Sequence, residues 1–160
     1  MQTKTILFLR FVLLILGTLV SILAVLGIPS LAREILNYHP EYSLQIYGVL
    51  LILYSTSVPF YYALIQSNKL LTYIQDRIAF SSLSVIALKK IKISAYGISL
   101  LYLIMLPFFY ILGAFDDAPG IILVGIVMIF SPLVIGFFAA ILQSLLEEAI
   151  NYKSENELTI

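Results

Sequence analysis

The sequence predicts an all-α integral membrane protein, a four-helix bundle with both termini in the cytoplasm (N-in/C-in). Three observations support this fold class. First, 61% of the 160 residues are apolar and 11% are charged, and the mean hydropathy of +1.05 lies far outside the range of soluble domains. Second, four apolar runs are long enough to cross a bilayer. Third, the basic residues gather in segments that four crossings would place on one side.

The four apolar runs use nearly the whole chain, so residues 1–160 are predicted to form a single membrane domain. We place the spans at about residues 6–28, 44–65, 93–112 and 121–146, with a loop at 66–92 and a tail at 147–160. About twenty helical residues cross a hydrocarbon core of about 30 Å. The first run lacks a small-residue cleavage pattern and is too long for a signal peptide, so we interpret it as a retained span.

The loop at residues 66–92 sets the predicted orientation. Loops rich in Lys and Arg stay in the cytoplasm, whereas acidic residues contribute little to orientation. This loop holds five of the nine basic residues: Lys69, Arg77, Lys89, Lys90 and Lys92. Three more fall on the same side after four crossings, namely Lys4, Arg10 and Lys153, and Arg33 alone falls outside. The loop and both termini are therefore predicted to be cytoplasmic.

The first span carries a strip of small residues. Gly17, Ser21 and Ala24 recur at i, i+4 and i+7, which predicts the close approach of another helix. Arg10 lies one turn inside the cytoplasmic end of this span. Because its long side chain can reach back to the lipid headgroups, we interpret Arg10 as an interfacial anchor rather than as a functional charge in the membrane.

Pro29 and Ser30 are predicted to end the first span. An external loop then follows at residues 30–43, with a short interfacial helix around residues 31–36. His39 lies in this loop without a second histidine, cysteine or aspartate at ligand spacing, so no metal site is expected there.

The second span contains a proline beside three hydroxyl side chains. Pro59 leaves the carbonyl of Ser55 without its helical donor, and the hydroxyl groups of residues 55–57 are expected to satisfy it while the helix bends. The functional alternative is a discontinuous helix that lines a substrate or ion site. Pro107 and Pro132 are the candidate kinks of the later spans. The three prolines lie at different depths, which argues against one shared midplane site.

An amphipathic helix is predicted in the cytoplasmic loop between the second and third spans. Four apolar residues share one helical face, opposite mainly polar and charged residues: Leu70, Leu71, Ile74 and Ile78. This pattern is typical of a helix that lies on the membrane surface or against a partner. Ser81 or Ser82 is expected to cap the next helix, which runs without a break into the third span.

Three lysines ring the entry of the third span, Lys89, Lys90 and Lys92. They favour anionic lipid headgroups. Without interleaved aromatic side chains, they are a weak signal for nucleic acid, so no direct nucleic-acid binding is expected.

The outer turn and the last span complete the predicted layout. Gly113 is expected to end the third span in the left-handed conformation, before an external turn at residues 115–120 whose two aspartates lack the ligand spacing of a calcium loop. In the last span, Gly136 and Ala140 form a second small strip. Two tyrosines lie deep, Tyr54 and Tyr102, and each is expected to find a hydrogen-bond partner on a neighbouring helix.

Several chemistries are not expected from this composition. The chain has no cysteine, and no Asp, Glu, His or Lys falls deep within a predicted span. Catalysis and proton-coupled transport usually need such groups within reach of one another. The sequence therefore predicts no catalytic residue, no metal ligand and no cofactor, and we do not expect an enzyme.

Two stretches resemble a known family. They are FSSLSVIALKKIKISAYG at residues 80–97 and EEAINYKSENELTI at residues 147–160. Both are similar to small bacterial four-helix membrane proteins catalogued as domain of unknown function 2975. The most specific piece is the ending Glu155, Asn156, Glu157, Leu158, Thr159 and Ile160. The resemblance implies a bacterial plasma-membrane protein without an established activity. Members of this family are often encoded beside a small helix-turn-helix regulator.

Two functional hypotheses follow. In the first, a non-enzymatic membrane protein docks and regulates a cytoplasmic protein partner, for example a transcriptional regulator, through the basic loop and the acidic tail. The plain interpretation of that short polar tail is a frayed end. In the second, the chain is a small transporter or channel subunit, or a toxin-immunity protein, that uses the kink at residues 55–59.

Overall fold

The computed structural model describes residues 2–115 and 117–159, and every regular element in these ranges is helical. In chain order the elements are α1 (Gln2–Ile22), the π-helical turn η1 (Leu23–Gly27), α2 (Ile28–Tyr38), the 3₁₀ turn η2 (Pro40–Tyr42), α3 (Ser43–Gln75), α4 (Ser82–Phe115) and α5 (Gly120–Leu158). Within these ranges, four continuous helical segments are long and apolar enough to cross a membrane. The all-α prediction with four helices of spanning length is confirmed.

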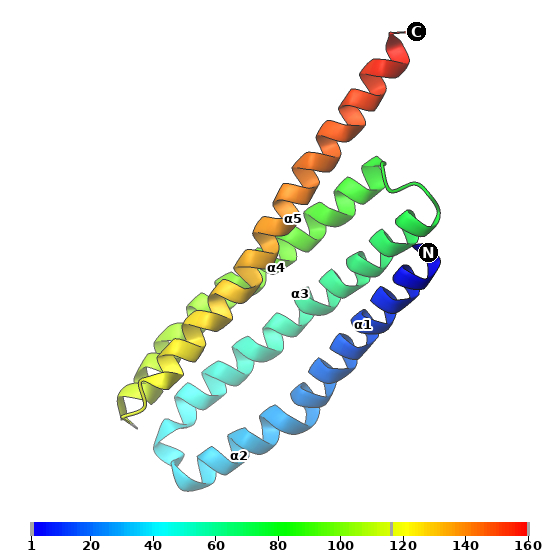
Figure 1. Ribbon diagram of the computed structural model, residues 1–160. Coiled ribbons are helices and arrows are strands. Elements are labelled where there is room, and N and C mark those ends of the chain that lie inside the picture. Colours follow the sequence, from blue (N-terminus) through cyan, green and yellow to red (C-terminus); the bar gives the residue numbers. More distant parts are fainter. Residues whose placement is uncertain (1, 116, 160) are drawn as a thin grey trace.

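The helices form an open row rather than a closed bundle (Figure 1). α3 packs against α1 on one side and α4 on the other, and α4 also packs extensively against α5. α1 and α5 lie at opposite edges of the row. The expected four-helix bundle is therefore corrected to a layer in chain order. The physical reason is that lipid tails solvate an apolar helix face about as well as another helix does, so no hydrophobic force closes the row.

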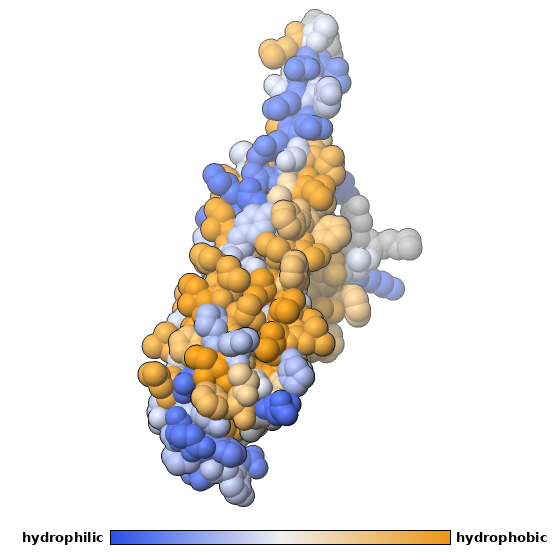
Figure 2. All heavy atoms as spheres, turned by 90° about the vertical axis from the view of Figure 1, so that its left-hand side faces the viewer, coloured by the Kyte–Doolittle hydropathy of each residue, from blue (hydrophilic) through white to orange (hydrophobic). Residues whose placement is uncertain are grey.

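Both chain ends and the α3–α4 connection lie at one end of the row, which we call the terminal end (Figure 1). The turns at residues 39–42 and 117–119 lie at the opposite end. In Figure 2, a broad hydrophobic belt separates hydrophilic surfaces at the two ends. α3, α4 and α5 have 33, 34 and 39 residues. At 1.5 Å per residue each helix is about 50 Å or longer, so each exceeds a core of about 30 Å.

The small strip of α1 receives tyrosines from α3, as its spacing predicts. The Ser21 and Tyr61 hydroxyl groups lie 2.5 Å apart. Tyr54 donates a 2.8 Å hydrogen bond to the carbonyl of Ala24. A methyl group added at Gly17 would approach α3 to 3.3 Å. The strip and the expected partner of Tyr54 are both confirmed.

Removing the Tyr61 hydroxyl should loosen α1 from α3. We expect Tyr61→Phe to lower stability by about 0.6 kcal/mol, the usual size of a hydrogen bond between membrane helices. The measurement is a double-mutant cycle with Ser21→Ala, followed by unfolding in detergent. If the two changes are additive, the 2.5 Å contact does not couple the helices.

Glycines of α5 let α4 approach closely. A methyl group at Gly136 would lie 2.6 Å from Cδ1 of Tyr96, and one at Gly125 would lie 2.9 Å from Cδ1 of Leu106. The Ser99 hydroxyl also donates to the carbonyl of Ile129 at 2.9 Å. These contacts confirm Gly136 as a packing position and show how closely α4 and α5 pack.

The second member of that strip and the second deep tyrosine differ from the prediction. Ala139 is buried and Ala140 is only half-buried, so the strip on α5 runs through Pro132, Gly136 and Ala139. In the described part of the chain, the Tyr102 hydroxyl has no hydrogen-bond partner, so the expectation for Tyr102 was wrong. Tyr102 lines a hollow whose other residues come from the first helical segment, α3 and α4.

Pro29 does not end the first helix. The chain passes through the π-helical turn η1, and Pro29 occupies the first turn of α2, where a missing N–H is tolerated. α2 then continues to Tyr38, so the interfacial helix expected at residues 31–36 is part of a longer one. The turn after it carries the pair His39 and Glu41, whose atoms Nδ1 and Oε1 lie 3.1 Å apart.

No separate amphipathic helix stands between the second and third long helices in the described chain. α3 runs unbroken to Gln75, because residues 66–75 contain no Gly or Pro. A Schellman motif then stops it. Arg77 takes a φ of 60°, and the N–H of Ile78 donates to the carbonyl of Tyr73 at 2.9 Å.

The start of α4 agrees with the prediction except for its cap. The helix runs without a break from Ser82 through the three lysines into the third span, which is confirmed. The carbonyl of Ser81 accepts the N–H groups of Ser84 and Val85. The Ser81 hydroxyl, however, is buried without a partner in the described chain, so it does not cap the helix.

Gly113 does not take the left-handed conformation. α4 continues to Phe115, and Asp117 adopts a φ of 50° instead. The N–H of Ala118 donates to the carbonyl of Gly113 at 3.0 Å, and a methyl group at Gly113 would meet the Ala118 oxygen at 3.1 Å. Glycine at position 113 therefore favours the close approach of the turn. Asp116 lies outside the described residues.

Candidate functional site

The basic residues of the predicted loop gather near the terminal end of the row. Lys69, Arg77 and Lys89 are exposed, and Lys90 and Lys92 are half-buried along α4. Across residues 2–115 and 117–159, no ion pair joins any of them to an acidic side chain. Their charge is therefore free to act on lipid or on a partner.

The C-terminal part of α5 projects beyond the rest of the molecule at the same end (Figure 1). We call residues 147–159 the projecting segment. Helix α5 continues to Leu158, so the expected frayed tail is replaced by a helix, and Leu158 itself is 84% exposed. The predicted tail residues Glu155, Asn156, Glu157 and Thr159 are exposed as well, and Ile160 lies outside the described residues.

The structure does not bring the tail and the basic loop into one continuous surface. Both lie toward the terminal end, but the projecting segment extends past the α3–α4 connection as a narrow hydrophilic arm (Figure 2). No hydrogen bond or ion pair links the two within the described ranges. They are therefore two separate surfaces, each with its own charge.

Arg10 binds α3 rather than reaching toward headgroups alone. Its Nη2 donates to Oγ1 of Thr72 at 2.9 Å and to Oε1 of Gln75 at 3.1 Å. Its Nε is buried without a partner in the described chain. These bonds fasten the N-terminal half of α1 to the end of α3. No local pattern points to Thr72 and Gln75, because more than sixty residues separate them from Arg10.

The hydroxyl groups before Pro59 do not satisfy the carbonyl of Ser55. The Ser55 hydroxyl donates to the carbonyl of Leu51 at 2.7 Å, and that of Thr56 donates to Leu53 at 2.7 Å. A serine or threonine in a helix reaches back three or four residues. Hydroxyls at residues 55–57 therefore serve carbonyls one turn earlier, and that prediction was wrong.

The three helix prolines face different surroundings. α3, α4 and α5 each continue through their proline. Pro59 lines a groove between α3 and α4, Pro107 lines a separate shallow hollow with Tyr110, and Pro132 is buried on the face of α5 that packs against α4. They do not converge on one site.

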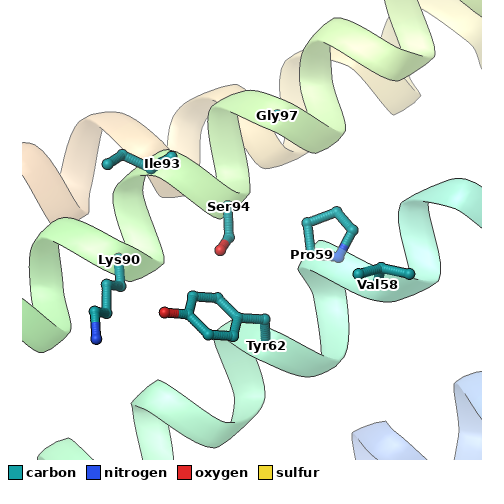
Figure 3. Close-up of a pocket in the computed structure, with 7 residues that line it drawn as sticks. All are labelled: Val58, Pro59, Tyr62, Lys90, Ile93, Ser94 and Gly97. Atoms are coloured by element: carbon teal, nitrogen blue, oxygen red, sulfur yellow. The ribbon is translucent and has the colours of Figure 1, made fainter.

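A groove of about 500 Å³ opens between α3 and α4 (Figure 3). We call it the α3–α4 groove. It is lined by Val58, Pro59 and Tyr62 from α3 and by Lys90, Ile93, Ser94 and Gly97 from α4. Of these residues, charge counting had singled out Lys90 and the proline rule Pro59. Tyr62 and Ser94 carried no sequence signal, because their role depends on which faces of the two helices meet.

Comparison with known proteins decides the family. The family of proteins of unknown function DUF2975 matches residues 30–160. The chain belongs to this family. An uncharacterized membrane protein of Bacillus subtilis (strain 168), YoaS, is 45% identical over 160 residues, which cover both chains completely. No solved structure matches. The resemblance stated for residues 80–97 and 147–160 is confirmed, and this DUF2975 chain is a membrane protein of uncharacterised function with four candidate spans.

The described residues of this DUF2975 chain include no group of three His, Asp or Glu side chains that could hold a metal ion. At the opposite end, the pKa of Glu41 is lowered by a hydrogen bond from its own backbone and by the His39 side chain. The side chains of His39 and Glu41 are 47% and 55% exposed, and the pair forms part of the turn after α2.

Proposed function

We propose that the protein is a non-enzymatic regulator in the bacterial plasma membrane, with both termini in the cytoplasm, and that it docks a cytoplasmic protein through the projecting segment. The length of α5 carries this proposal. Its 39 residues extend for about 58 Å, nearly twice the hydrocarbon core. A helix that served only as an anchor would not need this exposed extension.

The charge of the projecting segment supports a basic partner. It holds four glutamates and one lysine, and Glu148, Asn151 and Glu155 share one face at i, i+3 and i+7. Acidic side chains attract a positively charged surface and steer its approach. A helix-turn-helix regulator, the partner class that the family resemblance implies, has such a surface where it contacts DNA phosphates. Docking would then compete with DNA.

The first test is photo-crosslinking in living cells. A photoreactive amino acid replaces Asn151 in the full-length chain, and we expect one dominant protein adduct with a basic surface. The matched control replaces Asn37, which is also exposed and lies at the opposite end. An absence of adducts from position 151, with normal expression, would contradict the proposal.

Charge reversal tests the same surface by affinity. We expect the double change Glu148→Lys and Glu155→Lys to weaken binding of the identified partner at least about tenfold, since each close charge pair contributes about 1.5 kcal/mol or more. Binding is measured with the full-length protein in nanodiscs. The control is Glu34→Lys in α2. If the partner binds the double variant and the Glu34→Lys control with equal affinity, the projecting segment is not the docking site.

A further inference from the structure

We infer that the α3–α4 groove binds one anionic phospholipid, with the phosphate held by Lys90, Tyr62 and Ser94. The groove shares no residue with the projecting segment, so this inference is independent of the docking role. Three polar groups line the groove: Tyr62 lies on the face of α3 toward α4, and Lys90 and Ser94 lie on the face of α4 toward α3 (Figure 3).

All three polar groups lack a partner within the described part of the chain. Ser94 is only 6% exposed, yet its hydroxyl makes no hydrogen bond there and points toward Tyr62 (Figure 3). The Tyr62 hydroxyl points toward the side of Lys90 (Figure 3). Lys90 is half-buried and forms no ion pair. Five polar side-chain atoms of the described chain are buried without a partner, and the Ser94 hydroxyl is not one of them. It therefore stays accessible from the groove, where a ligand or water can bind it.

The arrangement along the groove matches the shape of a lipid. α3 and α4 are antiparallel, so Lys90 and Tyr62 lie toward the terminal end, while Val58 lies about one turn deeper than Tyr62 and Gly97 about two turns deeper than Lys90. The polar end thus falls at the headgroup level, beside the start of the predicted third span. Apolar residues and the missing side chain of Gly97 form the acyl part of the groove, where an added methyl group would meet nothing within 4 Å.

Charge selects the lipid class. Lys90 brings one positive charge that no acidic residue of the described chain neutralises. An ammonium group near the interface favours an anionic headgroup over a zwitterionic one. Two hydroxyl donors beside it suit phosphate oxygens, and bonds to a charged group are the stronger kind. Phosphatidylglycerol is therefore the chosen probe.

The test is native mass spectrometry of the full-length protein in detergent. Phosphatidylglycerol, phosphatidylcholine with the same acyl chains, and soluble glycerol phosphate are titrated separately. We expect one tightly bound phosphatidylglycerol, with at least about fivefold weaker binding of phosphatidylcholine. Equal retention of the two lipids would overturn the anionic assignment. Comparable binding of glycerol phosphate would show a phosphate site and not a lipid site.

Two variants separate the polar and apolar ends of the groove. Lys90→Gln should weaken phosphatidylglycerol binding about tenfold, whereas Lys89→Gln, at an exposed lysine outside the groove, should not. Gly97→Leu should fill the acyl end and also weaken binding, with an unchanged unfolding midpoint in the absence of lipid. If the two lysine variants lose binding equally, the effect is general surface charge, and the groove is not the site.

Discussion

Replacing Gly136 with leucine is expected to separate α4 from α5. Even a methyl group at this position would lie 2.6 Å from Cδ1 of Tyr96, a distance that real side chains do not adopt. Tyr96 cannot easily turn away, since its ring stacks edge-on against Phe137 with centroids 5.8 Å apart. Overpacking of this kind costs about 3 kcal/mol. We expect the unfolding midpoint in detergent to fall by roughly 10 °C, or the protein to aggregate.

The same change at Gly97 is the matched control. Gly97 also lies on α4, but a methyl group added there meets nothing within 4 Å, and a longer side chain extends into the open α3–α4 groove, so Gly97→Leu should leave the midpoint almost unchanged. A second variant keeps the prediction decisive if Gly136→Leu does not fold. Adding Tyr96→Ala to Gly136→Leu should recover part of the folded protein. Equal midpoints for Gly97→Leu and Gly136→Leu would show that α4 and α5 do not pack at Gly136.

A single cysteine introduced at either end of the row should be labelled by an impermeant reagent either fully or not at all, depending on its side of the membrane. The natural chain has no cysteine, so no background labelling is expected. Asn151→Cys lies on the projecting segment and Asn37→Cys at the opposite end, and both positions are exposed. The positive-inside rule predicts that Asn151 lies in the cytoplasm. In intact cells, an impermeant maleimide should label position 37 and not position 151.

Permeabilised cells supply the control for that experiment, because both positions should then react. Labelling at 151 and protection at 37 would reverse the orientation. The docking proposal would then lose its cytoplasmic partner, whereas the packing of the helices would be unaffected.

Hydropathy and charge predict the number of helices, their approximate limits and their common end, because these depend on transfer free energy along a continuous run. The exact helix ends depend on which local backbone conformation is lowest in free energy, and the hydropathy pattern does not reveal this. Pro29 fits inside a helix once η1 adds a π turn, and Arg77 and Asp117 adopt the left-handed conformation although glycine is the usual choice.

The candidate site was predictable only in its charged part. Lys90 stood out because a charge beside an apolar run is rare. Tyr62 and Ser94 did not, since their importance arises from the rotation of α3 against α4. Likewise, Arg10 meets Thr72 and Gln75 only when two antiparallel helices align in one register. Sequence periodicity identifies a face, but it does not identify the residue that the face will meet.

The edge position of α1 has a consequence for how the chain enters the bilayer during synthesis. The first helix leaves the ribosome before α3, the long helix against which it packs sparsely, has been made, and no buried residue lies in its most apolar window. It can therefore reside alone among lipids without exposing an unfinished interface. Once α3 has inserted, the hydroxyl groups of Tyr54 and Tyr61 form hydrogen bonds with the first helical segment. Insertion and assembly can therefore proceed as two separate events.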